Sequence, residues 1–230
     1  MKKPNKPTKK EKFQDTESIL KINNRINEEY CDETSNKLSD ENLLEEYKKS
    51  QSVKKQIDIL AKLLNQHHIS DEVNHNIIKE YTPNLIPPGT KGVIRGNTFN
   101  KIIKDEIDSM KLDEKLFEIC FEKECNICIT DEKPDWYIME KETKKVIVGM
   151  NQLDLIGGGA QSNRGSKYLI DSKHNTETSK LLCVICNKTI IKSEENKAYK
   201  LFKTGFDNDT MCYIKNLKQI ILKFFNLTKD

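Results

Sequence analysis

Hydrophobic residues in the first third of the chain recur every three or four positions, which is typical of amphipathic helices. Three groups have this spacing: Ile19, Leu20, Ile22 and Ile26; Leu43, Leu44 and Tyr47; and Ile57, Leu60, Leu63 and Leu64. Ser39 and Ser70 precede helical runs and are suitable N-cap residues. The pattern predicts a helical N-terminal region over residues 16–82.

The pattern changes in the second part of the chain. Residues 83–96 contain several helix-breaking residues and predict a loop between two domains: Pro83, Pro87, Pro88, Gly89, Gly92 and Gly96. A helix is expected over residues 97–110. Short apolar runs at 136–139, 146–155, 168–170 and 181–185 predict strands, and a wide apolar face predicts a closing helix over 211–227. Residues 83–230 therefore have the pattern of an α/β domain.

The composition and the distribution of charge predict, in addition, a disordered segment at the start of the chain. Hydrophobic residues make up 36% and charged residues 33% of the 230 positions, enough for one folded core with an extension. The net charge of +3 does not indicate a nucleic-acid partner, but the first twelve residues carry six lysines against the single acid Glu11. Residues 1–15 are predicted to be a disordered basic tail, which either adds affinity for phosphates or only improves solubility.

The chain has no run of about 20 apolar residues, and its first residues lack the apolar core of a secretory signal. Its seven cysteines are an odd number without an even spacing framework, which favours a reducing compartment. We expect a soluble cytoplasmic protein without membrane association.

Candidate catalytic residues lie on two neighbouring predicted strands. Asp135 opens the first, and alternation along the second places Gln152 and Asp154 on one face with Val146, Val148 and Met150. If the strands pair with Asp135 near the same end, two carboxylates and an amide meet. Such an oxygen-rich set suits Mg²⁺, which takes one or two carboxylates and keeps waters for substrate phosphates. Asp135 and Asp154 are the predicted metal ligands.

The segment 157–168 is rich in glycine and polar residues and contains no acid. Gln161, Asn163 and Arg164 are side chains that make bidentate contacts with base edges, so they are candidate DNA contacts, together with Arg95. Hydrolysis of a phosphodiester also needs a cation near the reacting group. Lys167 or Arg164 is expected on the scissile phosphate.

Three pieces carry a resemblance to a known family: residues 92–99 leading into a helix, residues 134–138, and residues 149–154 followed by 163–168. Together they resemble PD-(D/E)XK nucleases, and within them type II restriction endonucleases. The resemblance covers less than half of the chain. Asp135 matches the family aspartate, whereas Gln152-x-Asp154 stands where the family has an acid-x-lysine pair.

The resemblance implies a restriction-endonuclease-like core, in which helices flank a central mixed sheet, beside the helical N-terminal region. It also implies a sequence-specific, Mg²⁺-dependent endonuclease that cleaves double-stranded DNA. Because symmetric DNA sites call for symmetric readers, a homodimer is expected. A companion DNA methyltransferase acting on the same site is a further expected partner. The helical region would serve dimerisation or grip the DNA.

The cysteines offer an alternative mechanism. Cys125 and Cys128, with Cys183 and Cys186, have the pair spacing of a structural Zn²⁺ site, as in a zinc-stabilised nucleic-acid-binding protein without catalysis. The two pairs, however, flank the whole predicted catalytic hairpin. Cys183 and Cys186 also lie in an apolar run, where free cysteines behave as small core residues. Metal content separates the two alternatives.

Overall fold

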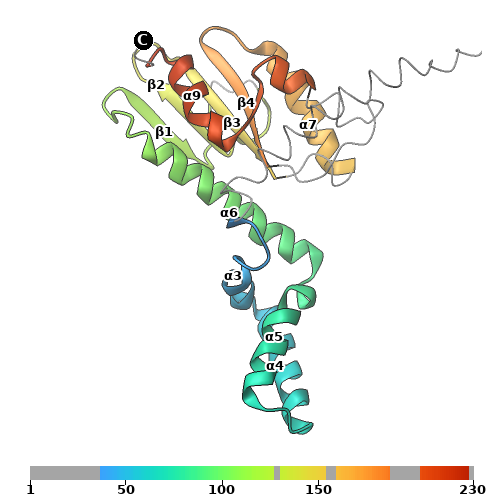
Figure 1. Ribbon diagram of the computed structural model, residues 1–230. Coiled ribbons are helices and arrows are strands. Elements are labelled where there is room, and N and C mark those ends of the chain that lie inside the picture. The colour runs from blue at the N-terminus through green and yellow to red at the C-terminus, as the bar shows by residue number, and fades with distance from the viewer. Residues whose placement is uncertain (1–36, 127–129, 154–158, 187–202, 228–230) are drawn as a thin grey trace, which may run out of the picture. The chain divides into compact units, whose positions relative to one another are not determined.

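The computed structural model describes residues 37–126, 130–153, 159–186 and 203–227 (Figure 1). The chain divides into two compact units. One comprises residues 33–102, and the other comprises residues 103–230 with residues 1–32. We call them the helical unit and the α/β unit.

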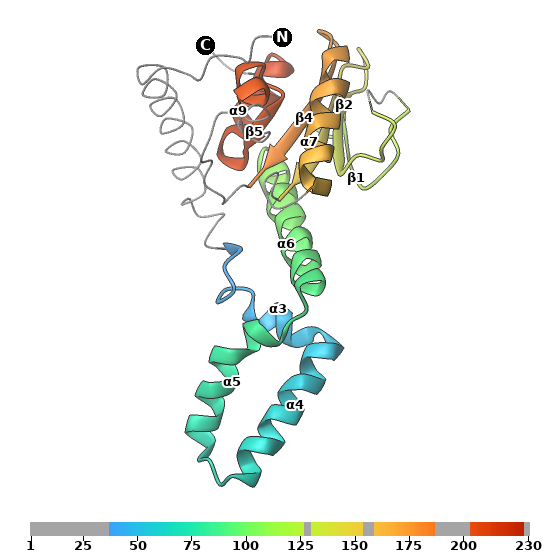
Figure 2. The same ribbon diagram turned by 90° about the vertical axis from the view of Figure 1, so that its right-hand side faces the viewer.

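The helical unit contains α3 (Leu44–Lys49), α4 (Gln51–Gln66), α5 (Asp71–Leu85) and the first part of α6 (Pro88–Ser109). Its small core consists of Leu43, Tyr47, Val53 and Ile86, with Ile57 and Ile94 packed against them. Helices α4 and α5 form an antiparallel hairpin (Figure 2). Near its tip, the amide of Asn74 donates a hydrogen bond of 2.8 Å to Asn65. Helices predicted within residues 16–82 are thus present from α3 onwards.

The loop predicted over residues 83–96 is wrong. Helix α5 continues through Pro83 to Leu85, and α6 begins at Pro88, so only Ile86 and Pro87 link them. A proline in the first turn of a helix removes no intrahelical hydrogen bond, because the N–H groups there have no partner in the helix. Gly89, Gly92 and Gly96 all lie inside α6. The two units divide between Ile102 and Ile103, within this helix.

The α/β unit is built on a five-stranded mixed sheet with the order β1-β2-β3-β4-β5. Its strands are β1 (Phe117–Phe121), β2 (Trp136–Glu140), β3 (Val146–Gln152), β4 (Ser179–Ile185) and β5 (Met211–Tyr213). Strands β1, β2 and β3 pair antiparallel, whereas β4 is parallel to β3 and β5 is parallel to β4. The α/β class and the mixed sheet flanked by helices are therefore confirmed.

Each face of this sheet is covered by helix. On one face, Tyr137, Val148 and Cys183 form a core with Tyr168 from α7 (Gly159–Asp171), the crossover helix between β3 and β4. Phe117 and Phe121 point to the opposite face, because side chains alternate along a strand. There Phe117 contacts Phe225, which follows α9 (Ile214–Phe224), with ring centroids 5.1 Å apart. Lys104 of α6 lies over the Phe121 ring at 4.4 Å.

Several predicted elements of this unit differ from the structure. The strand predicted over residues 168–170 is wrong, because these residues belong to α7. Two parallel neighbours such as β3 and β4 need a connection of about a dozen residues, usually a helix. Strands β1 and β5 were not predicted, and α9 starts at Ile214 instead of Met211. No helix in the described part of the chain is long and apolar enough to cross a membrane.

Candidate active site

Asp135 immediately precedes β2 and is held by the backbones of both neighbouring strands. Its N–H donates to the carbonyl of Gly149 at 3.1 Å, and its carbonyl accepts the N–H of Glu122 at 2.9 Å. Its Oδ2 accepts the backbone N–H of Asn151 at 2.6 Å. The carboxylate is therefore fixed against the last residues of β3, the arrangement expected from the two predicted strands.

The side chain of Trp136 lies on the face of the sheet opposite to that of Asp135 and holds the last residues of β3 from there. Its side chain is fully buried, and its Nε1 donates to Oδ1 of Asn151 at 3.0 Å. Only glycine fits at position 149, because a Cβ there would lie 1.8 Å from Cε2 of Trp136. The indole thus holds Asn151, whose N–H in turn holds Asp135.

The charges around Asp135 place it in an acidic environment. Burial raises the pKa of this half-buried carboxyl, and the negative charges of Glu122 and Glu132 raise it further. The N–H of Asn151 and the positive charge of Arg164 act in the opposite direction. A cation bound here would relieve this cost, because it would interact favourably with a partly desolvated carboxylate.

Lys167 reaches the loop that precedes β2. Its Nζ contacts Oδ1 of Asp131 at 2.5 Å and Oε1 of Glu132 at 3.0 Å. The second oxygen of Glu132 accepts the hydroxyl of Tyr168 at 3.3 Å, so this acid bridges two consecutive residues of α7. The side chain of Asp131 is 84% exposed, whereas those of Glu132 and Lys167 are 37% and 34% exposed. Asp131 is therefore the more exposed of the two carboxylates that contact this ammonium group.

The other predicted residues of the site are only partly described. Gln152 is the last residue of β3 and is buried, and its carbonyl accepts the N–H of Cys186 at 3.3 Å. Alternation places its side chain on the same face as Asp135, Val148 and Met150. Asp154 lies outside the described residues, so the predicted pair of metal ligands is not tested.

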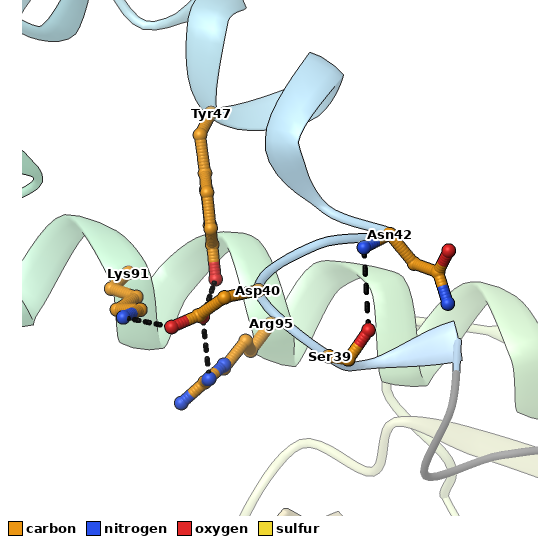
Figure 3. Close-up of polar contacts among 6 residues, drawn as sticks. All are labelled: Ser39, Asp40, Asn42, Tyr47, Lys91 and Arg95. Atoms are coloured by element: carbon orange, nitrogen blue, oxygen red, sulfur yellow. Dashed lines mark hydrogen bonds and ion pairs between the residues drawn. The ribbon is translucent and has the colours of Figure 1, made fainter. Parts of the chain in front are cut away.

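The predicted DNA contacts fall in both units. Asn163 and Arg164 are exposed on α7, which also includes Gln161, whose side chain is not described. Arg95 lies on α6 in the helical unit and donates to Oδ1 of Asp40 at 2.6 Å. Asp40 also accepts hydrogen bonds from Lys91 and from the hydroxyl of Tyr47 (Figure 3). In this structure Arg95 has a partner within its own unit.

The described cysteines are thiols in or near the core. Cys183 and Cys186 are buried, and Cys125 packs against the core that contains Cys183. Burial raises the pKa of Cys183, which favours the neutral thiol over the thiolate that binds zinc. Cys128 lies outside the described residues. Among the residues that are described, no three His, Cys, Asp or Glu side chains are grouped to hold a metal.

Three acids near Asp135 were not predicted from the sequence. Asp131 and Glu132 stand close before Asp135 in the chain, and a run of acids beside a candidate ligand was the available signal. Glu122 lies opposite Asp135 across the sheet, where its N–H bonds to the Asp135 carbonyl. It could be found only after β1 and its register with β2 were known.

Comparison of the whole chain with protein-family models, with curated proteins and with solved structures finds no match. A carboxylate held between strand ends, with Arg164 and Lys167 supplied by the following helix, has the charges needed to bind a cation and a phosphate together.

Proposed function

We propose that the chain is a sequence-specific, metal-dependent endonuclease that cleaves double-stranded DNA, like type II restriction enzymes. The observation that carries the proposal is the fixed carboxylate of Asp135 beside the end of β3, within electrostatic reach of Arg164. The order of elements supports a restriction-endonuclease-like core: helix α6, three antiparallel strands, helix α7 and the parallel strand β4.

The donors present fit Mg²⁺, a hard cation that binds carboxylate oxygen. Asp135 would hold it, with Asp154 as the proposed second carboxylate. A bound Mg²⁺ would activate water and neutralise charge on the phosphate. Gln152 would orient that water or support the metal site. Lys167 would contact the scissile phosphate, which would then replace Asp131, the more exposed of its two carboxylate partners.

The proposed partner is duplex DNA, read by Asn163, Arg164 and Gln161 on α7. A helix fits the major groove, where each base pair presents a distinct pattern of donors and acceptors. Arg95 would take part only if its ion pair with Asp40 opens. A companion DNA methyltransferase is the proposed protection against self-cleavage.

The test is to incubate the full chain with long duplex DNA, with and without millimolar Mg²⁺, and to sequence the fragment ends. Wild type should give fragments that share one end sequence, only with Mg²⁺. Asp135→Asn should give at least about 100-fold less cleavage, a typical loss for a group that stabilises the transition state. Asp108→Asn, which changes an exposed acid paired with Lys104 on α6, is the matched control and should cleave normally.

Intact DNA in every reaction would overturn the catalytic proposal. If the same protein still bound duplex DNA, the zinc-stabilised, non-catalytic alternative would gain support, and metal analysis would then look for one Zn²⁺ per chain. Equal cleavage by wild type and Asp135→Asn would instead remove Asp135 from the site.

A further inference from the structure

The α4–α5 hairpin exposes large apolar side chains that its own core does not cover. Ile59 and Leu63 of α4 are 63% and 50% exposed, and Val73 and Tyr81 of α5 are 48% and 52% exposed. Ile77 of α5, one turn from each of these last two, is half-buried. Exposed apolar residues that gather on one surface mark an interaction site, whereas single ones do not.

The α4 residues belong to a stripe with coiled-coil spacing. Successive steps of four, three, four and three residues connect five uncharged side chains: Ser52, Gln56, Ile59, Leu63 and Gln66. This alternation keeps one line of a helix facing a partner helix. In α4 the line does not face the hairpin core, because Val53 and Ile57 pack in that core. Its two apolar members, Ile59 and Leu63, therefore mark the part of this line that can contact a second helix.

Helical geometry places the apolar residues of both helices on one side of the hairpin. At about 100° per residue, Ile59 and Leu63 lie about 110° counterclockwise from the buried line of α4, seen from its N-terminus. Val73, Ile77 and Tyr81 lie about 100° counterclockwise from the buried line of α5, through Asn74 and Thr82, seen from its own N-terminus. The two helices are antiparallel and turn their buried lines toward each other. A counterclockwise rotation of about the same size in each helix, seen from its own N-terminus, therefore brings both apolar lines to the same side of the hairpin.

We propose that this side of the hairpin binds the same side of a second copy of the chain, forming an intermolecular four-helix bundle. A two-fold axis parallel to the helices places α4 of one copy against α5 of the other. All neighbouring helices are then antiparallel, as in up-and-down bundles. The contact is isologous, because the same surface serves both copies.

The levels of the apolar residues along the hairpin agree with this packing. The hydrogen bond between Asn65 and Asn74 shows which residues of α4 and α5 lie at the same height. Heights along the hairpin are counted backwards from Asn65 in α4 and forwards from Asn74 in α5. On this scale Ile59 lies between Ile77 and Tyr81, and Leu63 lies between Val73 and Ile77. Each side chain of α4 thus meets a gap between two side chains of α5 in the second copy, which is how helices interdigitate.

The charges at the borders of the apolar side favour a two-fold axis parallel to the helices over one perpendicular to them. Lys55 and Lys62 border the outer edge of the α4 line, and Glu80 borders the outer edge of the α5 line. With the axis parallel to the helices, Glu80 of one copy lies between Lys55 and Lys62 of the other. An axis perpendicular to the helices would instead place lysines against lysines. The charges of the two copies are therefore complementary only when the two-fold axis is parallel to the helices.

The size of the contact indicates a dimer that dissociates on dilution. Helices of 15 and 16 residues are about 24 Å long, and two of them side by side cover on the order of 500 Å² per copy. This is at the lower end of specific interfaces. Self-association should accordingly depend on concentration.

The test is sedimentation equilibrium of the full chain across micromolar concentrations, without DNA or Mg²⁺. Wild type should approach a dimer, and Leu63→Glu should raise the dissociation constant at least about tenfold. The matched control is Leu116→Glu, at an equally exposed leucine in the α/β unit, which should leave the dimer unchanged. Circular dichroism should be the same for all three proteins. A monomeric wild type, or a dimer that survives Leu63→Glu, would overturn the proposal.

Charge reversal tests the arrangement of the two copies. Glu80→Lys alone, and Lys55→Glu with Lys62→Glu, should each weaken the dimer several-fold, because like charges then meet. Combining all three changes should restore most of the affinity. A triple variant as weak as its parents would rule out this packing. Since no DNA is present, these results are independent of the proposed nuclease activity.

Discussion

The Oδ2 of Asp135 lies 2.6 Å from the backbone nitrogen of Asn151, so a strand backbone holds this carboxylate. The negative charges of Glu122 and Glu132 oppose its ionisation, whereas the positive charge of Arg164 favours it. An acid that is fixed in place but poorly compensated costs stability. Such a cost is expected where a site is built to bind a cation.

Asp135→Asn should therefore stabilise the metal-free protein at neutral pH while it abolishes cleavage. Burial raises the pKa of Asp135, so the folded state binds the proton more tightly than the unfolded state. Stability is then lost as the pH rises from the unfolded pKa through the folded one. The asparagine retains an oxygen for the Asn151 N–H and carries no charge.

The measurement is urea unfolding of both proteins with EDTA, between pH 4 and pH 8. The variant should have the higher free energy of unfolding at pH 7, and the difference should shrink toward pH 4. A variant that is less stable than wild type at pH 7 would contradict the assignment of Asp135 as a poorly compensated charge.

The contact between Gly149 and Trp136 predicts a large cost for one methyl group. In Gly149→Ala the new Cβ would overlap the fully buried indole ring, so the strand or the ring must move. Overpacking of this kind costs about 1–3 kcal/mol of unfolding free energy. Gly96→Ala is the matched control, because nothing lies within 4 Å of its Cβ position in α6. It should instead stabilise by up to about 1 kcal/mol through helix propensity.

Both changes are measured by denaturant unfolding. The fluorescence of Trp136, the single tryptophan, follows the α/β unit with Gly149, and circular dichroism follows the loss of helix in the unit with Gly96. The Gly149 variant should also change the emission spectrum of the folded state, because its indole loses its position beside Asn151. Equal stabilities of the two alanine variants would show that the sheet accommodates the methyl group freely.

The strands that carry Asp135 and Gln152 were predictable because their apolar runs are continuous and bounded by polar residues. Strands β2 and β3 begin at Trp136 and Val146, as expected. Strand β1 was missed, since Phe117–Phe121 contains an internal glutamate and lies at the sheet edge, where hydrophobic patterning is weak. Without β1, the position of Glu122 beside Asp135 could not be inferred.

Helix α7 could not be recognised from local preference. Glycine and polar residues at its start favour a loop, and among the α7 residues whose burial is described, from Asn163 onwards, Tyr168 is the only large side chain that is buried. The helix forms because the crossover between β3 and β4 places Tyr168 on the sheet, a tertiary effect that overrides propensity. For the same reason the partners of Lys167 were not foreseen. They come from a loop 35 residues earlier in the chain.

Asp131 should limit the affinity of the free protein for DNA. Its carboxylate is 84% exposed and contacts Lys167 at 2.5 Å, so it would compete with a phosphate oxygen for this ammonium group. Asp131→Asn removes one of the two carboxylates that contact this ammonium group and leaves Glu132, so DNA should bind several-fold more tightly at low salt. Lys167→Gln should have the opposite effect. Asp207→Asn, which changes an exposed aspartate paired with Lys203, is the matched control.

Fluorescence anisotropy with a labelled duplex, at two salt concentrations and with Ca²⁺ in place of Mg²⁺ to prevent cleavage, measures these affinities. The gain from Asp131→Asn should diminish at high salt, because the attraction to phosphate is electrostatic. If Asp131→Asn and Asp207→Asn bound equally, Lys167 would not be a phosphate contact.

Asp40 should be the most sensitive surface carboxylate of the helical unit. It accepts hydrogen bonds from Lys91, Arg95 and Tyr47, which join the segment before α3 to α6 (Figure 3). Desolvation acts to raise the pKa of Asp40, but these donors outweigh it and lower the pKa. Burial and the Asp40 bond raise the pKa of the Tyr47 hydroxyl to about 12.

Asp40→Ala should therefore cost about 1–2 kcal/mol, a value reduced for solvent screening of this one-third exposed group. Because the folded pKa is lowered, the contribution is complete above the unfolded pKa of about 3.8 and is lost as the pH falls through the folded value. Hydrogen exchange of the Tyr47 and Lys91 amides should accelerate at pH 7. Glu45→Ala, which removes an exposed carboxylate paired with Lys48 on α3, should leave these rates unchanged. Equal exchange rates in the two variants would show that Asp40 does not hold α3 and α6 together.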